Sequence, residues 1–255
     1  MIEVKNISKS FDGKTILHSV SAQFKDGLTN LIIGQSGSGK TVLMKSLVGL
    51  HTPDQGEILY DGRDLLKMNN SQKKELRKEI GMLFQGSALF DSETVLGNVM
   101  FPLKMFSDMS YEEQLERAHF CIKRVNLVGA DDKYPSETSG GMQKRVAIAR
   151  AIALNPQYLF CDEPNSGLDP KTSLVIDELL HSITKEYNIT TIINTHDMNS
   201  VMGIGENIIF IYEGHKEWQG QSKDIMGTTN QKLADFIFAS DLLKKMRNTY
   251  MEKIK

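Results

Sequence analysis

The sequence predicts an α/β fold whose core is a parallel β-sheet covered by helices. Short, nearly continuous runs of Val, Ile, Leu and Phe indicate strands that are buried on both faces. Segments with apolar residues at helical spacing separate these runs. Strand signals then disappear between Gly86 and Asn155, where only helical periodicity remains, and this pattern predicts a helical insertion within the α/β core.

Composition limits the class of protein. The chain has 255 residues, of which 40% are hydrophobic and 24% charged, as in ordinary globular proteins. A formal charge of -2 gives no field that would gather nucleic acid. The longest apolar runs, such as Ile208 to Tyr212, are much shorter than the roughly 20 residues that cross a bilayer, and no signal peptide is evident. Cys121 and Cys161 fit a reducing compartment as packed residues, with a redox pair as the alternative. We expect a cytoplasmic protein.

The elements follow the chain in order. β-Branched and aromatic runs predict the first strands at Ile2 to Ile7, Val20 to Lys25, Leu28 to Gly34, Gly56 to Tyr60 and Ile80 to Gln85, with a helix at Gly39 to Leu50. Helical spacing predicts helices at Val95 to Phe106, Tyr111 to Val128, Gly140 to Leu154, Pro170 to Tyr187 and Asp197 to Gly203. Strands return at Gln157 to Asp162, Ile189 to Thr195 and Glu206 to Tyr212. The tail, Leu233 to Lys255, reads as one amphipathic helix.

A glycine-rich segment joins a predicted strand to a predicted helix. It fits G-x-x-x-x-G-K-[ST] at every fixed position, as Gly34-Gln35-Ser36-Gly37-Ser38-Gly39-Lys40-Thr41. Glycines let backbone N–H groups converge on phosphate oxygens at a helix start, a site that extends to Val42. Lys40 would reach the β and γ phosphates, and Thr41 would offer its hydroxyl to Mg²⁺. The alternative is a glycine-rich turn with an exposed lysine, which needs no acidic partner elsewhere.

An acidic pair ends the apolar strand that runs from Tyr158. Asp162 is placed to hold Mg²⁺ directly or through water. Glu163 points the other way by strand alternation and could polarise an attacking water. A solvated strand end is the alternative interpretation, which would hold if the glycine-rich loop were absent.

Thr138-Ser139-Gly140-Gly141-Met142 precedes a predicted helix, and Ser139 with two glycines forms a second anion site. Here the chain resembles the ABC ATPase family, whose signature is usually Leu-Ser-Gly-Gly-Gln. Gln85, Ser166-Gly167-Leu168-Asp169 and His196 follow the family order, so the resemblance covers Ile2 to about Gly220. It implies a P-loop NTPase (RecA-like) core with an N-terminal antiparallel β subdomain and an inserted helical subdomain. The expected ATPase domain is 1–240, with its core at 1–85 and 156–220, its insertion at about 86–155, and an amphipathic extension at 241–255.

The resemblance also implies roles. Glu163 would be the general base, His196 would contact the γ-phosphate, and Gln85 would sense metal and water. Asp169 would shape the dimer contact, and Phe11 would stack on adenine, with a packed aromatic as the alternative. The cofactors would be ATP and Mg²⁺, bound in a homodimer whose signature closes on the partner's nucleotide. Thr138 and Met142 depart from the usual leucine and glutamine, and we expect activity to survive both.

Two further segments suggest the kind of transporter. Phe84 to Phe90 and Thr94 to Leu103, with the Gly-Gly-Met signature, are similar to ATPases of MCE-associated (Mla-type) lipid transporters. This implies permease subunits, an MCE-type substrate-binding protein, and a peripheral position on the inner membrane. A metabolite importer, or a soluble ABC ATPase, is the alternative. The apolar residues of these segments form either a groove for a permease helix or internal packing. The tail either helps hold the dimer or folds against its own domain.

Overall fold

The computed structural model describes residues 1–254, and for residues 242, 253 and 254 it describes the backbone alone. This chain forms two compact units. The first contains Met1–Met68 and the described residues from Ile192 onward, and the second contains Asn69–Thr191. Among the helices of the described chain, none combines the length and the apolar character that a bilayer crossing requires.

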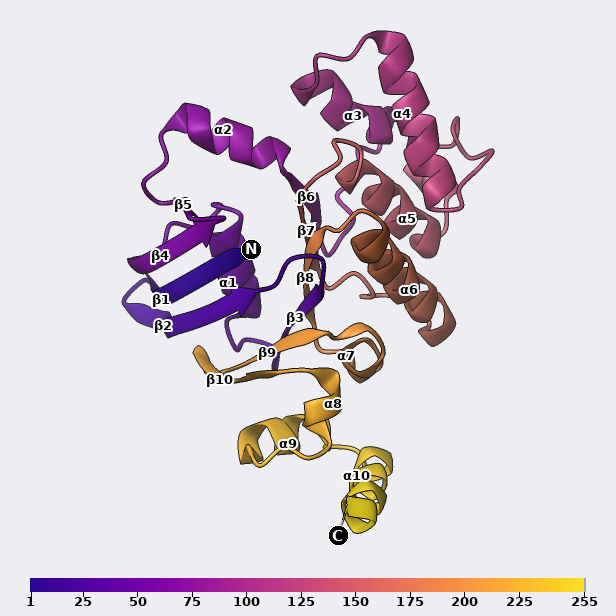
Figure 1. The fold of residues 1–255 in the computed structure, drawn as a ribbon. Coiled ribbons are helices and arrows are strands. Elements are labelled where there is room, and N and C mark those ends of the chain that lie inside the picture. Colours follow the sequence, from indigo (N-terminus) through magenta and orange to yellow (C-terminus); the bar gives the residue numbers. More distant parts are fainter. Residues whose placement is uncertain (255) are drawn as a thin grey trace. The chain divides into compact units, whose positions relative to one another are not determined.

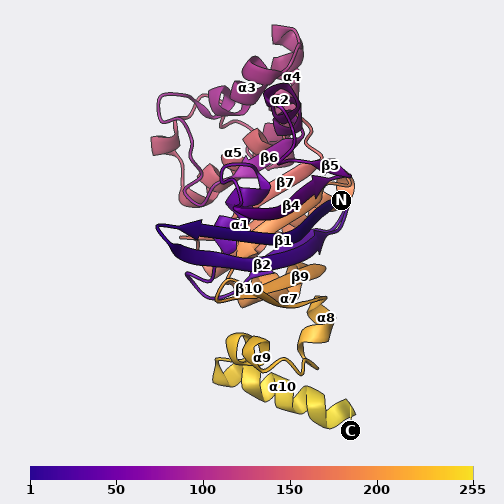
Figure 2. The ribbon, with the colours of Figure 1, turned by 90° about the vertical axis from the view of Figure 1, so that its left-hand side faces the viewer.

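The first unit contains an antiparallel sheet with the strand order β2-β1-β4-β5 (Figures 1 and 2). An Asp12-Gly13 turn joins its first two strands, and both turn residues have positive φ, as a tight hairpin requires. Apolar side chains on one face of each long strand are buried, among them Ile2, Val4 and Phe24. The strands are β1 (Ile2–Phe11), β2 (Lys14–Phe24), β4 (Gln55–Tyr60) and β5 (Arg63–Asp64).

The same unit contains parallel strands. In β3 (Thr29–Ile33) and β9 (Asn207–Tyr212) all residues but Tyr212 are buried, and the two strands pair in parallel from Asn30 opposite Asn207. The strand order here is β10-β9-β3-β8, with β10 antiparallel to β9. The remaining elements are β8 (Thr190–Thr195), which crosses the unit boundary, β10 (His215–Gly220), α1 (Lys40–Leu47) and α7 (Met198–Ile204).

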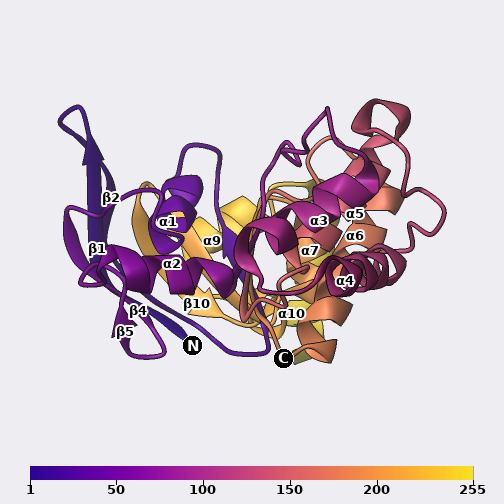
Figure 3. The ribbon, with the colours of Figure 1, turned by 90° about the horizontal axis from the view of Figure 1, so that it is seen from above.

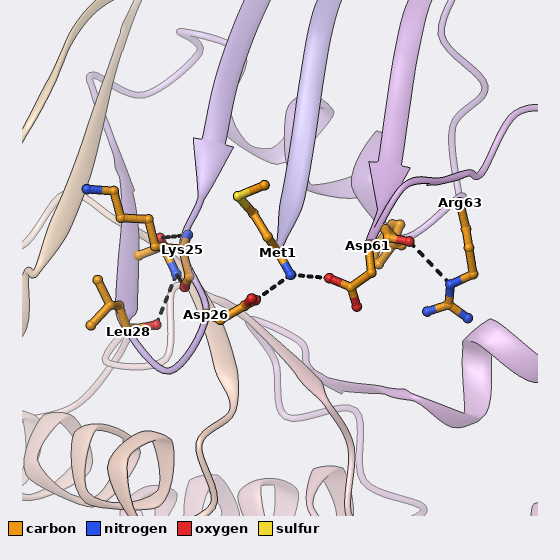
Figure 4. A network of polar contacts seen from close by, with 8 residues as sticks. Met1, Lys25, Asp26, Leu28, Asp61 and Arg63 are labelled. Carbon is orange, nitrogen blue, oxygen red and sulfur yellow. Dashed lines mark hydrogen bonds and ion pairs between the residues drawn. The ribbon is translucent and has the colours of Figure 1, made fainter.

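Polar contacts tie together the strand ends of the first unit (Figure 4). The amino group of Met1 pairs with the carboxylates of Asp26 and Asp61. Burial lowers the pKa of this amino group, but the hydrogen bonds that it donates to the two carboxylates outweigh that effect and raise the pKa. Nearby, Arg63 donates through Nε to the carbonyl of Tyr60 at 3.2 Å. These contacts fix the ends of β1, β4 and β5.

The end of the first unit corrects the prediction of one long tail helix. The helix is interrupted at residues 238–240. Ser240 Oγ accepts a hydrogen bond from the amide of Leu243 and so caps the start of a new helix. Figure 2 shows α9 and α10 lying side by side. The three C-terminal helices are α8 (Ser222–Ile225), α9 (Gln231–Ile237) and α10 (Asp241–Ile254). Lys255, the last residue of the predicted helix, lies outside the described residues.

The second unit pairs two parallel strands and packs helices beside them. Strands β6 (Ile80–Leu83) and β7 (Tyr158–Asp162) align with Leu83 opposite Cys161, and β8 follows in the order β8-β7-β6. No strand lies within the described residues 86–155, as the periodicity predicted, and the flanking strands end at Leu83 and begin at Tyr158. Figure 3 shows α3 crossing close to α5, and α4 packs on both. The helical elements are α2 (Asn70–Lys78), α3 (Val95–Phe106), α4 (Tyr111–Arg124), the 3₁₀ turn Pro135–Glu137, α5 (Gly140–Ala151) and α6 (Pro170–Glu186).

Candidate functional site: a phosphate loop and a glutamine–glutamate pair

The phosphate loop, Gly34–Thr41, connects β3 to α1 in the first unit. Gly34 has φ 152°, and a Cβ there would lie 2.1 Å from the carbonyl oxygen of Ile211. Gly39 has φ 105°, and a Cβ there would lie 2.9 Å from Leu17 Cδ2. Gly37 also has a positive φ, 79°. The backbone therefore adopts turns that only glycine makes without strain, and at Gly34 the backbone of β9 leaves no room for a side chain.

Lys40 is 6% exposed, and its ammonium lies inside the curve of the phosphate loop. Nζ donates to the carbonyls of Gly34 and Gln35, each at 2.9 Å. Ser38 is buried, and its Oγ has no hydrogen-bond partner among the described residues. A buried hydroxyl without a partner costs free energy unless a ligand supplies one. The loop thus fits a phosphate: a cation, an unsatisfied hydroxyl and the N-terminus of α1 all belong to it.

The hairpin between β9 and β10 holds the phosphate loop from outside. The amide of Gly214 donates to the carbonyl of Ser38 at 3.0 Å, and the carbonyl of Gly214 accepts from the amide of His18 at 2.9 Å. The rings of His18 and His215 stack with centroids 4.5 Å apart. One turn residue therefore ties β2 to the phosphate loop.

The other predicted residues of the first unit lie at its surface. Phe11 is 38% exposed at the end of β1, with His51 edge-on at 5.2 Å and the ammonium of Lys9 5.2 Å from its ring centroid. Thr41 is exposed, as are Gln35 and Ser36, and Val42 is half-buried. His196 is exposed at the end of β8, just before the N-cap residue of α7, Asp197.

In the second unit, Gln85 and Glu163 follow the ends of adjacent parallel strands. Gln85 Nε2 donates to Glu163 Oε2 at 3.3 Å. Glu163 is half-buried, and its φ of 46° lies in the left-handed region, which costs a non-glycine residue about 1–3 kcal/mol. Asp162, directly before it, is 8% exposed. The structure thus joins two of the predicted catalytic residues by a hydrogen bond.

The predicted second anion site is a capped helix start. Ser139 is the N-cap of α5, and its Oγ accepts from the amide of Met142 at 3.3 Å. A Cβ on Gly141 would lie 2.8 Å from Thr172 Cγ2, so this helix start approaches α6 closely. Thr138 Oγ1 donates to the carbonyl of Pro135 at 2.7 Å. Thr138 is therefore accommodated locally in place of the family's leucine.

Asp169 has a local use that the sequence did not indicate. It caps α6, accepting from the amides of Lys171 and Thr172 at 3.0 Å each and from the hydroxyl of Thr172. The hydrogen bonds from Thr172, its hydroxyl first, lower the pKa of this carboxyl. Within the described residues, no three His, Cys, Asp or Glu side chains cluster as metal ligands. The predicted Mg²⁺ residues, Thr41, Gln85 and Asp162, are drawn from both units.

An apolar groove of about 480 Å³ lies in the second unit. Its walls include Phe84, Phe90, Phe101, Phe106 and Leu154, with the guanidinium groups of Arg77 and Arg150. The rings of Phe90 and Phe101 lie 4.5 Å apart. Because several of these large side chains are exposed, the groove offers more apolar surface than internal packing requires.

The sequence did not single out Lys144, which contacts the predicted site. It is 4% exposed on α5, and its Nζ donates to the carbonyl of Gln85. Lysine in a helical pattern ordinarily reads as a solvated residue, so no sequence signal marked it.

Known proteins share this architecture. The ABC transporter family model matches residues 17–166. The methionine import ATP-binding protein MetN 1 of Oceanobacillus iheyensis is 38% identical, over 99% of this chain and 78% of its own. The intermembrane phospholipid transport system ATP-binding protein MlaF of Haemophilus influenzae is 35% identical, over 93% of this chain and 90% of its own.

A solved structure agrees. The ATP-binding cassette MJ0796, determined as a dimer in a post-hydrolysis state bound to ADP and Pi, is 34% identical to this chain. The match covers 87% of this chain and 99% of that one, with a TM-score of 0.80. The predicted fold, a P-loop NTPase core with an antiparallel sheet and a helical insertion, is confirmed. The chain belongs to the ABC transporter family, as an ATP-hydrolysing subunit of the kind that works as a dimer with membrane permease subunits.

Proposed function

We propose that Glu163 is the general base for ATP hydrolysis and that Gln85 positions both this carboxylate and the attacking water. The observation that supports this proposal most directly is the 3.3 Å hydrogen bond from Gln85 Nε2 to Glu163 Oε2. This bond fixes the orientation of the Glu163 carboxylate, and a carboxylate held in this way can take a proton from water. His196 contacts the γ-phosphate.

The phosphate loop holds the triphosphate. Its backbone amides and Lys40 bind the β and γ phosphates, and Ser38 Oγ gains the hydrogen-bond partner that it lacks among the described residues. Thr41, Gln85 and Asp162 would hold Mg²⁺, which neutralises charge on the phosphates. Phe11, with an exposed ring, stacks on adenine.

A second copy completes each site. Ser139, Gly140 and Gly141 present the start of α5 to an anion, and one copy has no use for two γ-phosphate sites. The anion is therefore the γ-phosphate held by the partner, and Asp169 belongs to the same contact through the start of α6.

The cargo that we propose is a phospholipid or related lipid of the Gram-negative envelope. The Gly-Gly-Met signature, the segments from Phe84 to Phe90 and Thr94 to Leu103, and the likeness to the phospholipid transport protein MlaF support it. The apolar groove would receive a permease helix, which would place the chain on the cytoplasmic face of the inner membrane, with an MCE-type protein in the complex. Import of methionine is a second candidate, favoured by the likeness to MetN.

Glu163→Gln tests the base. This change keeps the shape and the hydrogen bond to Gln85 but removes the carboxylate, so ATP binding should persist while hydrolysis falls by about 10²–10⁴-fold. The matched control is Glu178→Gln, at an exposed acid on α6. An unchanged rate in Glu163→Gln would remove this residue from its role.

The cargo is tested separately, in the purified complex with its permease subunits. Phospholipids supplied in the membrane should stimulate ATP hydrolysis, and methionine should not. Stimulation by methionine alone would contradict the lipid proposal and leave the ATPase mechanism intact.

A further inference from the structure

Lys144 is a buried charged residue that has no role in the mechanism proposed above. It is 4% exposed, and among the described residues its hydrogen-bond partner is the carbonyl of Gln85. Burial lowers the pKa of this lysine, and the neighbouring Cys161 and Glu163 oppose that shift. Removing an ammonium from water costs several kcal/mol, which one neutral carbonyl does not fully offset. A methionine would fill the same volume without that cost.

The loop that Lys144 contacts is strained. The ladder between β6 and β7 ends with Leu83 opposite Cys161, so Gln85 lies beyond it. Ser87 and Ala88 then have φ of 63° and 47°, two consecutive non-glycine residues in the left-handed region. Such conformations are unfavourable for non-glycine residues and persist only where surrounding contacts fix them.

The fixing contacts come from one helix, α5. Arg150 donates through Nη2 to the carbonyl of Ser87 and through Nη1 to that of Ala88, each at 2.8 Å. Lys144 does the same for Gln85. Two cations of α5 therefore hold three carbonyl groups of the 85–88 backbone, and Lys144 holds the residue whose side chain reaches Glu163.

We propose that Lys144 is a positioning residue for ATP hydrolysis: by anchoring the Gln85 carbonyl, it sets the Gln85 amide against Glu163 from the helix that begins at Ser139. The inference rests on the proposed function. Because α5 starts at the second anion site, the helix that meets the partner's nucleotide also fixes the residues that handle water. The charge of Lys144 lies near Cys161 of β7 and near Glu163, just beyond the end of that strand, and its role is to hold geometry.

Lys144→Met removes the anchor and keeps the volume. A misplaced reacting group costs up to about 100-fold, so kcat should fall by about 10- to 100-fold while KM for ATP changes by less than about twofold. Lys144→Arg should restore much of kcat. Lys144→Gln, which keeps a donor without the charge, covers the case that Lys144→Met does not fold. The matched control is Lys123→Met, an exposed lysine of α4.

A double substitution separates positioning from general packing. If Lys144 acts through Gln85, adding Lys144→Met to Gln85→Ala should lower kcat no further. Amide hydrogen exchange should also speed up in residues 84–88 of Lys144→Met, independently of activity.

Three results would overturn the inference: unchanged kcat in Lys144→Met and Lys144→Gln, full additivity with Gln85→Ala, or unchanged exchange at 84–88. If Glu163→Gln kept full hydrolysis, the proposed function itself would fail. If Glu163→Gln were inactive and Lys144→Met fully active, only the inference about Lys144 would fail.

Discussion

Gly214→Ala perturbs the phosphate loop from a residue outside it. Gly214 has φ 76°, and an added Cβ would lie 2.2 Å from the carbonyl oxygen of Ile16 and 2.8 Å from His18 Cδ2. The backbone of this hairpin must therefore shift. Its shift would break or lengthen the hydrogen bonds to His18 and Ser38, which measure 2.9 and 3.0 Å.

The free-energy cost of Gly214→Ala has two parts, the strained backbone conformation and the weakened hydrogen bonds. A substitution at a second glycine measures the first part alone. Gly13 has φ 78° with nothing within 4 Å of an added Cβ, so Gly13→Ala pays for the backbone conformation alone, about 1 kcal/mol. Gly214→Ala adds two weakened hydrogen bonds at about 1 kcal/mol each, which gives about 3 kcal/mol. For a chain of this size, the difference in stability between the two variants should make the Tm of Gly214→Ala about 4–8 °C lower than that of Gly13→Ala.

Thermal unfolding and titration with a fluorescent ATP analogue measure both effects. Gly214→Ala should lose stability and nucleotide affinity together, because its amide holds Ser38 of the phosphate loop. Gly13→Ala should lose stability slightly and keep its affinity. Equal Tm and affinity in the two variants would refute the clash argument.

Three more changes follow from the contacts. Asn98 is fully buried and bonds the backbone of residues 90–94, so Asn98→Ala should cost about 3 kcal/mol in urea unfolding, and a loss below about 1 kcal/mol would contradict this. Burial raises the pKa of Cys121 to about 11 and also raises that of Cys161, so a thiol reagent at pH 8 should label neither until the protein unfolds. Hydrogen bonds from Thr172 lower the pKa of Asp169, so its contribution to stability is present above the unfolded pKa of about 3.9 and is lost as pH falls through the folded value. In a plot of stability against pH, Asp169→Ala should therefore lose less stability on acidification than the wild type does. An unchanged pH dependence in this variant would contradict the role of Asp169 as a helix cap.

The sequence predicted what its apolar periodicity encodes. The bounds of α3 came out as expected, and β3, β7 and β9 agree within a residue or two, because buried parallel strands carry uninterrupted apolar runs. It missed α2 and β10, whose residues are mostly polar. A capping box at Asn69 and Gln72 could have marked the first.

The residues of the candidate site also fall into those that the sequence predicted and those that it did not. Motifs gave the phosphate loop and the acidic pair, since each is contiguous in sequence. Lys144 and Gly214 act through contacts with residues far along the chain, and no local pattern reveals such contacts. The tail prediction was wrong because helical spacing continued across Ser240, where a serine cap restarts the helix.

Mixing two inactive variants tests the central claim most directly. Lys40→Ala removes the phosphate loop's cation, and Ser139→Ala removes the cap of the second anion site. If each ATP lies between the loop of one copy and the helix start of the other, a mixed dimer regains one intact site, and an equimolar mixture should recover about a quarter of wild-type ATP hydrolysis. If both groups serve the same copy's nucleotide, the mixture should stay as inactive as either variant alone, and that result would contradict the account.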